Sequence, residues 1–281
     1  MQLSNIQLIN KQLVYYKKLS PANNTANLPH IIWGHGWAQD HQSLLPIATS
    51  LQHVANHWLI DFPGFGSSSK PTDTWGSKEY AHLTSEWIKM NIATDATKIW
   101  VGHSFGCRIG IAITSLNPNL LHGLFLIAAA GVPRPISLTK KIIRLIKINC
   151  FKLLKNLIIL FNNINHKQHL NWIRTKFGSH DYKNADPEMR DILVKTINEN
   201  LSCHAQKINC PTELLYGNND NDTPLIMGNT LNKLIKNSIL HVIPNKDHHS
   251  VLQEDIHQVA YLLNKFINKI QDGKLANIND C

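Results

Sequence analysis

The chain has 281 residues, 43% of them hydrophobic and 17% charged, which excludes an intrinsically disordered protein and suits one large α/β domain or two smaller ones. Its five cysteines are scattered and none forms a C-x-x-C pair, which excludes a disulfide framework and a cysteine-based zinc site. The formal net charge is +9, and twelve of the 28 Lys and Arg residues fall within residues 96–180, where there is no Asp or Glu.

The N-terminal residues lack a basic segment followed by an apolar one, so we expect no signal peptide. The scattered cysteines fit a reduced, cytoplasmic protein. The longest stretch without charge, residues 109–132, is interrupted at residues 117–119 by Asn-Pro-Asn. It therefore predicts a helix, a turn and a strand rather than a membrane span.

Strands and helices alternate along the first half of the chain. Residues 2–18 predict two strands joined near Asn10 and Lys11, because apolar and polar residues alternate on both sides of that turn. Further strands are expected at residues 30–33, 58–61, 98–101 and 123–127, and helices at 42–52, 78–92 and 105–116.

The alternation breaks at residues 131–135, and mostly helical periodicity continues to about residue 205. A strand at 212–217, a helix at 224–236, a strand at 239–244 and a helix at 254–271 complete the chain. Consecutive apolar residues in strands that alternate with helices predict an α/β fold with a mostly parallel sheet covered on both faces. The expected organisation is a core of residues 1–133 and 206–272, a helical cap (lid) insertion at 134–205 and a tail at 273–281.

A GHSFG motif at residues 102–106 lies between a predicted strand and a predicted helix. Glycines two positions before and after Ser104 allow the tight turn that exposes a nucleophilic hydroxyl. A serine hydroxyl also needs a histidine to accept its proton and an acid to orient that histidine.

Two later loops supply these groups in the order Ser, Asp, His. Asp220 follows the strand at 212–217, and His248 follows the last strand. Asp222 competes with Asp220, although Asp220 is favoured by its position four residues before Pro224, and His249 competes with His248. No grouping of histidines has metal-ligand spacing, so we predict no metal.

With these motifs, the sequence resembles the α/β-hydrolase superfamily in its single-domain, capped form. The resemblance covers about residues 30–270 and includes GHGW at 34–37 and DFPGFGSS at 61–68. It implies an oxyanion hole formed by the backbone N–H groups of Trp37 and Phe105, a Ser104–Asp220–His248 catalytic triad, and no cofactor. Family members usually have Gly or Ala where this chain has Asp247; the resemblance favours His248 because the next position often carries a large ring.

Structural roles are expected for three polar residues near these motifs. We expect His35 to bond within its turn, Asp61 to tie loops together, and His103 to shape the pocket.

The predicted function is that of a serine hydrolase, which cleaves a carboxylic ester or thioester through an acyl-enzyme. C–C bond hydrolases and cofactor-free haloperoxidases would use the same triad, and a non-catalytic ligand- or membrane-binding member of the fold is a further alternative. The GHGW turn also resembles esterases that demethylate pimeloyl-carrier-protein esters in biotin synthesis.

Residues 138–161 form a predicted basic amphipathic helix of the cap. Its basic residues fall on one face: Lys140, Lys141, Arg144, Lys147, Lys152 and Lys155. Solvated lysines on a cap helix are one interpretation, and docking of an acidic carrier protein or an anionic membrane surface is the other. Nucleic acid is not an expected partner, because the segment has few interleaved aromatic residues.

Overall fold

The computed structural model describes residues 5–21, 27–134, 146, 149–150, 153, 182 and 185–279. The chain divides into two compact units, one of Met1–Arg134 with Lys195–Cys281 and the other of Pro135–Val194. The six basic residues predicted to share a face of the cap helix lie outside the described residues. The cap boundaries and the docking surface therefore stay predictions.

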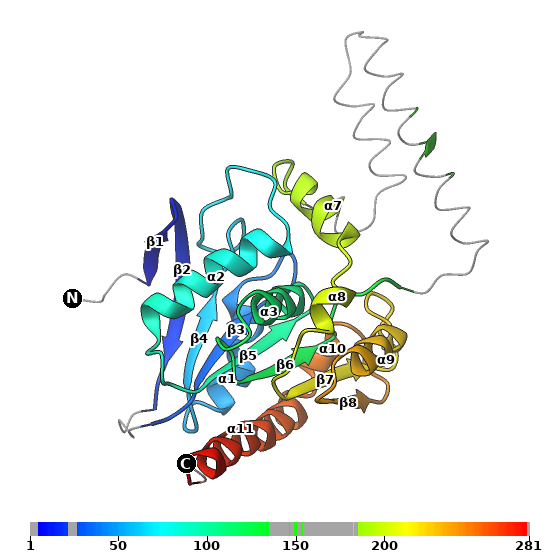
Figure 1. Cartoon of the computed structure of the whole chain (residues 1–281). Coiled ribbons are helices and arrows are strands. Elements are labelled where there is room, and N and C mark those ends of the chain that lie inside the picture. The colour runs from blue at the N-terminus through cyan, green and yellow to red at the C-terminus, as the bar shows by residue number, and fades with distance from the viewer. Residues whose placement is uncertain are drawn as a thin grey trace. The chain divides into compact units, whose positions relative to one another are not determined.

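An eight-stranded sheet in the order β1-β2-β4-β3-β5-β6-β7-β8 forms the first unit (Figure 1). The strands are β1 (Ile6–Ile9), β2 (Gln12–Leu19), β3 (His30–Gly34), β4 (Asn56–Ile60), β5 (Lys98–His103), β6 (Gly123–Ile127), β7 (Thr212–Gly217) and β8 (Ser238–Ile243). Strands β3 to β8 pair in parallel, and β1 and β2 are antiparallel to their neighbours. The predicted α/β class with a mostly parallel sheet is confirmed.

The first two strands form a hairpin with a two-residue turn. Ile9 pairs with Gln12, and the intervening Asn10 and Lys11 have φ values of 48° and 68°. Two successive residues with positive φ give a turn whose twist matches that of the flanking strands. The predicted pair of strands joined at this position is confirmed.

Helices cover both faces of the sheet (Figure 1). Helices α2 (Ser77–Asn91) and α3 (Phe105–Leu116) lie on one face, and α1 (Leu45–Ser50) and α11 (Ile256–Asn279) lie on the other. The shorter helical elements are η1 (His41–Ser43), α7 (Arg190–Asn198), α8 (Ser202–Ala205), α9 (Leu225–Leu234) and α10 (Ser250–Gln253).

Alternate positions of the sheet strands form the core cluster on the α1 and α11 face, and the positions between them in β5 and β6 are buried as well. Ile31, Val101 and Phe125 are fully buried and pack in one cluster with apolar residues of α1 and α11. All residues of β5, β6 and β7 are buried. Because these central strands are covered on both faces, their carboxyl ends are held rigidly, and the loops that follow them are anchored there.

Two helices differ from their sequence-based ranges. The helix predicted at 42–52 is a 3-10 turn followed by α1, since Pro46 has no N–H and is accommodated only in the first turn of a helix. The last helix divides at Asp255 into α10 and α11, and α11 continues through Gly273 to Asn279. Among the described residues, no helix is both long and apolar enough to cross a bilayer.

Candidate active site

Ser104 occupies a strained turn between β5 and α3. Its φ of 49° and ψ of −103° lie in a region that non-glycine residues rarely adopt, at a cost of about 1–3 kcal/mol. Its backbone N–H donates to the Ile127 carbonyl of β6 at 3.0 Å, which fixes the turn to the neighbouring strand. A Cβ at Gly106 would overlap the Gly34 carbonyl, so only glycine fits there. The sequence-based expectation of a tight strand-to-helix turn therefore has a steric basis.

Asp220 lies in the loop after β7 and is 4% exposed. One carboxylate oxygen, Oδ1, accepts the backbone N–H groups of Asp222 and Thr223, each at 2.8 Å. The other, Oδ2, lies 2.7 Å from His248 Nδ1 and 2.8 Å from Thr223 Oγ1. Burial alone would raise the pKa of this carboxyl, but the hydrogen bond and electrostatic attraction of His248, with the hydrogen bonds from Thr223, hold the pKa below its usual value.

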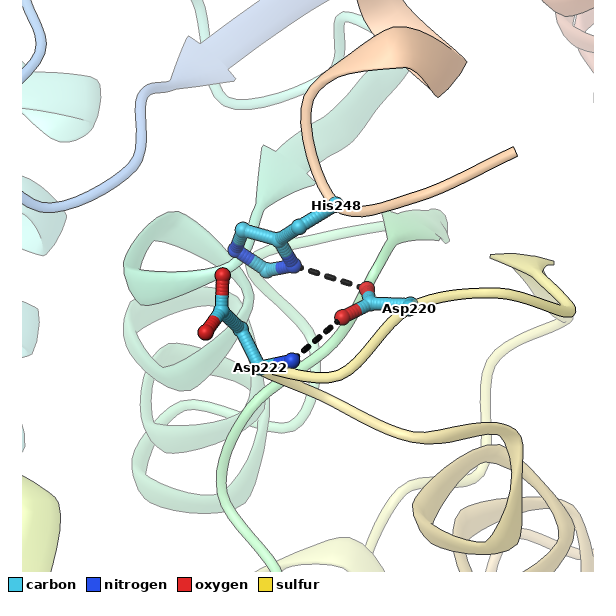
Figure 2. Close-up of side chains that lie close together, drawn as sticks. All are labelled: Asp220, Asp222 and His248. Atoms are coloured by element: carbon cyan, nitrogen blue, oxygen red, sulfur yellow. Dashed lines mark hydrogen bonds and ion pairs between the residues drawn. The ribbon is translucent and has the colours of Figure 1, made fainter.

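His248 lies in the loop after β8 and is 8% exposed. Since the Asp220 carboxylate can only accept a hydrogen bond, the imidazole proton lies on Nδ1, and Nε2 has a free lone pair. This is the tautomer that a general base for a serine requires. Figure 2 shows the imidazole facing the Asp220 carboxylate across the two loops.

Thr223 completes this pair and was not predicted from the sequence. Its hydroxyl lies between Asp220 Oδ2, the Ala128 carbonyl oxygen at 3.0 Å and His248 Nδ1 at 3.1 Å. It thereby connects the Asp220 loop to the end of β6. An Asp followed three residues later by Thr just before a proline is the only sequence signal, and it reads equally as a helix-capping turn.

The competing residues have different contacts. Asp222 donates its backbone N–H to the Asp220 carboxylate (Figure 2), and the residue itself is exposed. His249 is exposed at the start of α10, and its backbone N–H donates to Asp247 Oδ1 at 3.0 Å. Asp247 also accepts the Ser250 N–H at 2.8 Å. The unusual Asp before His248 therefore closes the turn that begins α10.

The structure connects Ser104 to His248 through His103. Among the described residues, no hydrogen bond joins the Ser104 hydroxyl to the His248 ring. His103, the residue before Ser104, has its ring centroid 4.9 Å from that of His248, and its Nε2 lies 3.1 Å from the His248 carbonyl oxygen. The loop of His248 is thus packed against the residue that precedes the serine.

The predicted oxyanion-hole residues pack against each other. The Trp37 and Phe105 rings meet edge to face with centroids 5.5 Å apart. Phe105 is the first residue of α3, so its N–H has no acceptor within the helix. In the described part of the chain, the Trp37 N–H donates no hydrogen bond either, and both groups are available as donors.

The loop that carries Trp37 is held by buried polar groups. His35 Nε2 accepts the Phe62 N–H at 3.0 Å, so its Nδ1 donates to the Gly36 carbonyl at 2.7 Å. Burial lowers the pKa of His35 to about 4 and keeps it neutral. Asp61, fully buried, accepts the backbone N–H groups of His41 at 2.7 Å and Ser67 at 2.9 Å. Both contacts match the structural roles expected from the sequence.

Asp220, Asp222 and His248 each offer a ligand atom, and these atoms lie within 4.8 Å of one another. The group does not fit a metal ion, because both Asp220 oxygens are already occupied by hydrogen bonds and His248 Nδ1 donates its proton to one of them. An ion would have to displace these bonds. The arrangement instead orients and polarises an imidazole.

The chain is similar in sequence to known proteins. A family model described as alpha/beta hydrolase fold matches residues 29–255. A segment of 58 residues is 29% identical to the biotin biosynthesis bifunctional protein BioHC of Saccharophagus degradans, covering 21% of this chain and 10% of that protein. The probable lysophospholipase BODYGUARD 2 of Arabidopsis thaliana is 20% identical over 280 residues, covering 86% of this chain and 59% of that protein. The chain thus spans less than two thirds of either relative.

Solved structures share the fold at low identity. A putative lipase from Acinetobacter baumannii AYE superposes with a TM-score of 0.72 at 19% identity, covering 96% of this chain and 92% of that one. An esterase from Exiguobacterium antarcticum gives 0.68 at 16%, covering 95% and 100%. A meta-cleavage product hydrolase from Pseudomonas fluorescens IP01 gives 0.66 at 16%, covering 94% and 97%. These likenesses show the fold alone.

Proposed function

Since this chain belongs to the α/β hydrolase fold family, we propose that it is a serine hydrolase that cleaves a carboxylic ester or thioester through an acyl-enzyme intermediate. The observation that carries the proposal is the buried Asp220–His248 pair, joined at 2.7 Å beside the strained turn of Ser104. Buried carboxylates that orient a histidine next to a serine in such a turn serve to activate that serine.

In the proposed reaction, His248 Nε2 takes the proton of the Ser104 hydroxyl as its oxygen attacks the substrate carbonyl carbon. The tetrahedral intermediate collapses, the bond to the leaving alcohol or thiol breaks, and His248 returns the proton to that group. Water then repeats the sequence on the acyl-enzyme, with His248 as base, and releases the carboxylic acid. Asp220 keeps the imidazole in one tautomer and stabilises the imidazolium that forms twice per turnover.

The intermediate's oxyanion would accept the N–H groups of Trp37 and Phe105. Phe105 opens α3, so the helix dipole adds favourable charge at the same position. Removing one such donor typically raises the barrier by about 3–4 kcal/mol. The edge-to-face contact of the two rings supports this role, because it holds the two donors in a fixed relation.

The substrate class is proposed from the aromatic residues beside these donors. Phe65 packs on Trp37 with centroids 4.9 Å apart and on Phe105 at 6.0 Å. Trp37 is partly exposed, whereas Phe105 is 3% exposed. An apolar wall next to the oxyanion hole favours an ester with an apolar acyl or alcohol group.

A screen of p-nitrophenyl esters from acetate to dodecanoate, with Ser104→Ala as the control, tests this proposal. We expect hydrolysis in the wild-type protein and its loss in the variant. Equal hydrolysis by both proteins would reject Ser104 as the nucleophile. A C–C bond hydrolase with the same triad would instead cleave a ring-cleavage product much faster than any of these esters.

A carrier-linked acyl group remains a second substrate proposal. It is motivated by the predicted basic helix and by the local similarity to a biotin biosynthesis protein. Reversing the charges of Lys140, Lys141 and Arg144 should weaken turnover of an acyl group on an acidic carrier protein and spare small esters. Equal losses on both substrates would contradict it.

A further inference from the structure

His103 is a buried histidine for which the proposed reaction has no use. It ends β5, directly before Ser104, and is 1% exposed. Its Nδ1 lies 3.2 Å from Gln39 Oε1, and its Nε2 lies 3.1 Å from the His248 carbonyl oxygen. One ring therefore connects three parts of the site, namely the Ser104 turn, the Trp37 loop and the His248 loop.

Both ring nitrogens face acceptors. Gln39 Oε1 already accepts the Gly36 N–H at 2.9 Å, which fixes the side-chain amide with its oxygen toward His103. A neutral imidazole carries one N–H, so only one of the two contacts is a hydrogen bond. Burial, with the nearby His248, lowers the pKa of His103 to about 3, and the ring is neutral at ordinary pH.

The proton belongs on Nε2. Gln39 Oε1 has the Gly36 N–H as a donor, whereas the described residues offer the His248 carbonyl no donor other than His103. A buried carbonyl without a donor costs about 1–3 kcal/mol, so the single proton is most useful there. Nδ1 then faces the Gln39 side chain as an unprotonated nitrogen.

We propose that His103 is a positioning residue that holds the His248 loop against the nucleophile turn through its Nε2–H. This inference rests on the proposed function. The same role requires that the His103 ring stay neutral. A positive charge on a ring whose centroid is 4.9 Å from that of His248 would oppose the imidazolium that forms there during the reaction.

Three substitutions separate the two contacts. His103→Gln places an amide N–H near the position of Nε2, His103→Asn places one near Nδ1, and His103→Leu removes both. We expect the Gln variant to keep kcat on p-nitrophenyl butyrate within about threefold of wild type. The Asn and Leu variants should lose kcat about 10- to 100-fold with little change in KM, because a lost hydrogen bond and a misplaced base slow the chemical step.

His57 supplies the matched control. It is fully buried, its Nδ1 accepts the Trp33 indole N–H at 3.1 Å, its Nε2 lies 2.9 Å from the Leu51 carbonyl, and burial lowers its pKa to about 4. His57→Asn should reduce stability without changing kcat per active site. A fluorophosphonate titration of active sites in every variant corrects for unfolded protein.

Equal kcat losses in the Gln and Asn variants of His103, or losses that vanish after the titration, would overturn the positioning role. The same holds if His57→Asn lowers kcat per active site as much as His103→Asn does. Failure of the proposed function has a different signature, because the wild-type protein would then show neither ester hydrolysis nor titration at Ser104.

Discussion

Replacing Asp220 by Asn changes one atom of a carboxylate whose hydrogen bonds the structure fully specifies. Oδ1 accepts two backbone N–H groups at 2.8 Å each, from Asp222 and Thr223. An amide side chain must keep its oxygen there, since turning it would leave two N–H groups, one of them buried, facing an NH2 group. The NH2 group then points at His248 Nδ1, which has to become an acceptor.

The expected loss of kcat follows from the change of the His248 tautomer. With Nδ1 accepting, the imidazole proton moves to Nε2, the nitrogen that should take the Ser104 proton. Such a tautomer change in a serine triad costs about 10⁴-fold in kcat, which corresponds to about 5.4 kcal/mol of barrier. The carboxylate also contributes to stability. Because the folded-state pKa of Asp220 is lowered, this contribution is present above the ordinary Asp pKa and is lost as the pH falls through the lower folded value.

The assay is kcat/KM on p-nitrophenyl butyrate, with urea denaturation of each variant near neutral pH. Asp222→Asn is the matched control, two residues away with an exposed side chain, and should keep activity within about tenfold because it leaves the His248 tautomer unchanged. The reasoning would be refuted if Asp220→Asn kept more than a tenth of wild-type activity while folded. It would also be refuted if both variants lost activity equally.

Two other predictions follow from packing and burial. Gly106→Ala should abolish esterase activity and lower the free energy of unfolding by at least about 2 kcal/mol, because its Cβ meets the Gly34 carbonyl. Gly273→Ala in α11 places its Cβ in open space and should stabilise the protein by about 0.5–1 kcal/mol. Urea denaturation of both variants measures the difference, and similar effects would contradict the steric argument. The pKa of His57 is about 4 in the folded protein and 6.5 in the unfolded chain. Between these two pH values the unfolded chain binds a proton that the folded protein does not, so the contribution of His57 to stability falls as the pH drops from 6.5 to 4. His57→Gln should reduce that slope by about 1.4 kcal/mol per pH unit, and an unchanged slope in denaturation at pH 4.5–6.5 would show that His57 is not held neutral.

Much of the fold was predictable, because runs of apolar residues, and the turn residues that end them, reflect local chemistry. Helix α3 begins at Phe105 and ends at Leu116 as the sequence predicts, between the glycine-flanked Ser104 and Asn117-Pro118. The hairpin at Asn10 was equally readable. The short helix α1 could not be predicted, since periodicity does not show where the 3-10 turn ends and the α-helix that contains Pro46 begins.

For the candidate site, the sequence indicates which loops take part and does not indicate their contacts. Sequence order identified the loops of Asp220 and His248, but loop residues have no periodicity to say which of Asp220 and Asp222 turns inward. Tertiary contacts give the answer, with Thr223 and two backbone N–H groups enclosing Asp220. The link from His103 to the His248 carbonyl joins residues 145 positions apart, and no local pattern encodes it.

Covalent labelling mapped to a single residue tests the central claim most directly. A fluorophosphonate probe, followed by peptide mass spectrometry, should modify Ser104 stoichiometrically in the wild-type protein. Labelling should be absent in Ser104→Ala, slowed at least about 10³-fold in His248→Gln and nearly unchanged in His249→Gln. A serine elsewhere taking the label, or equal rates in the two histidine variants, would show that Ser104 and His248 do not act together.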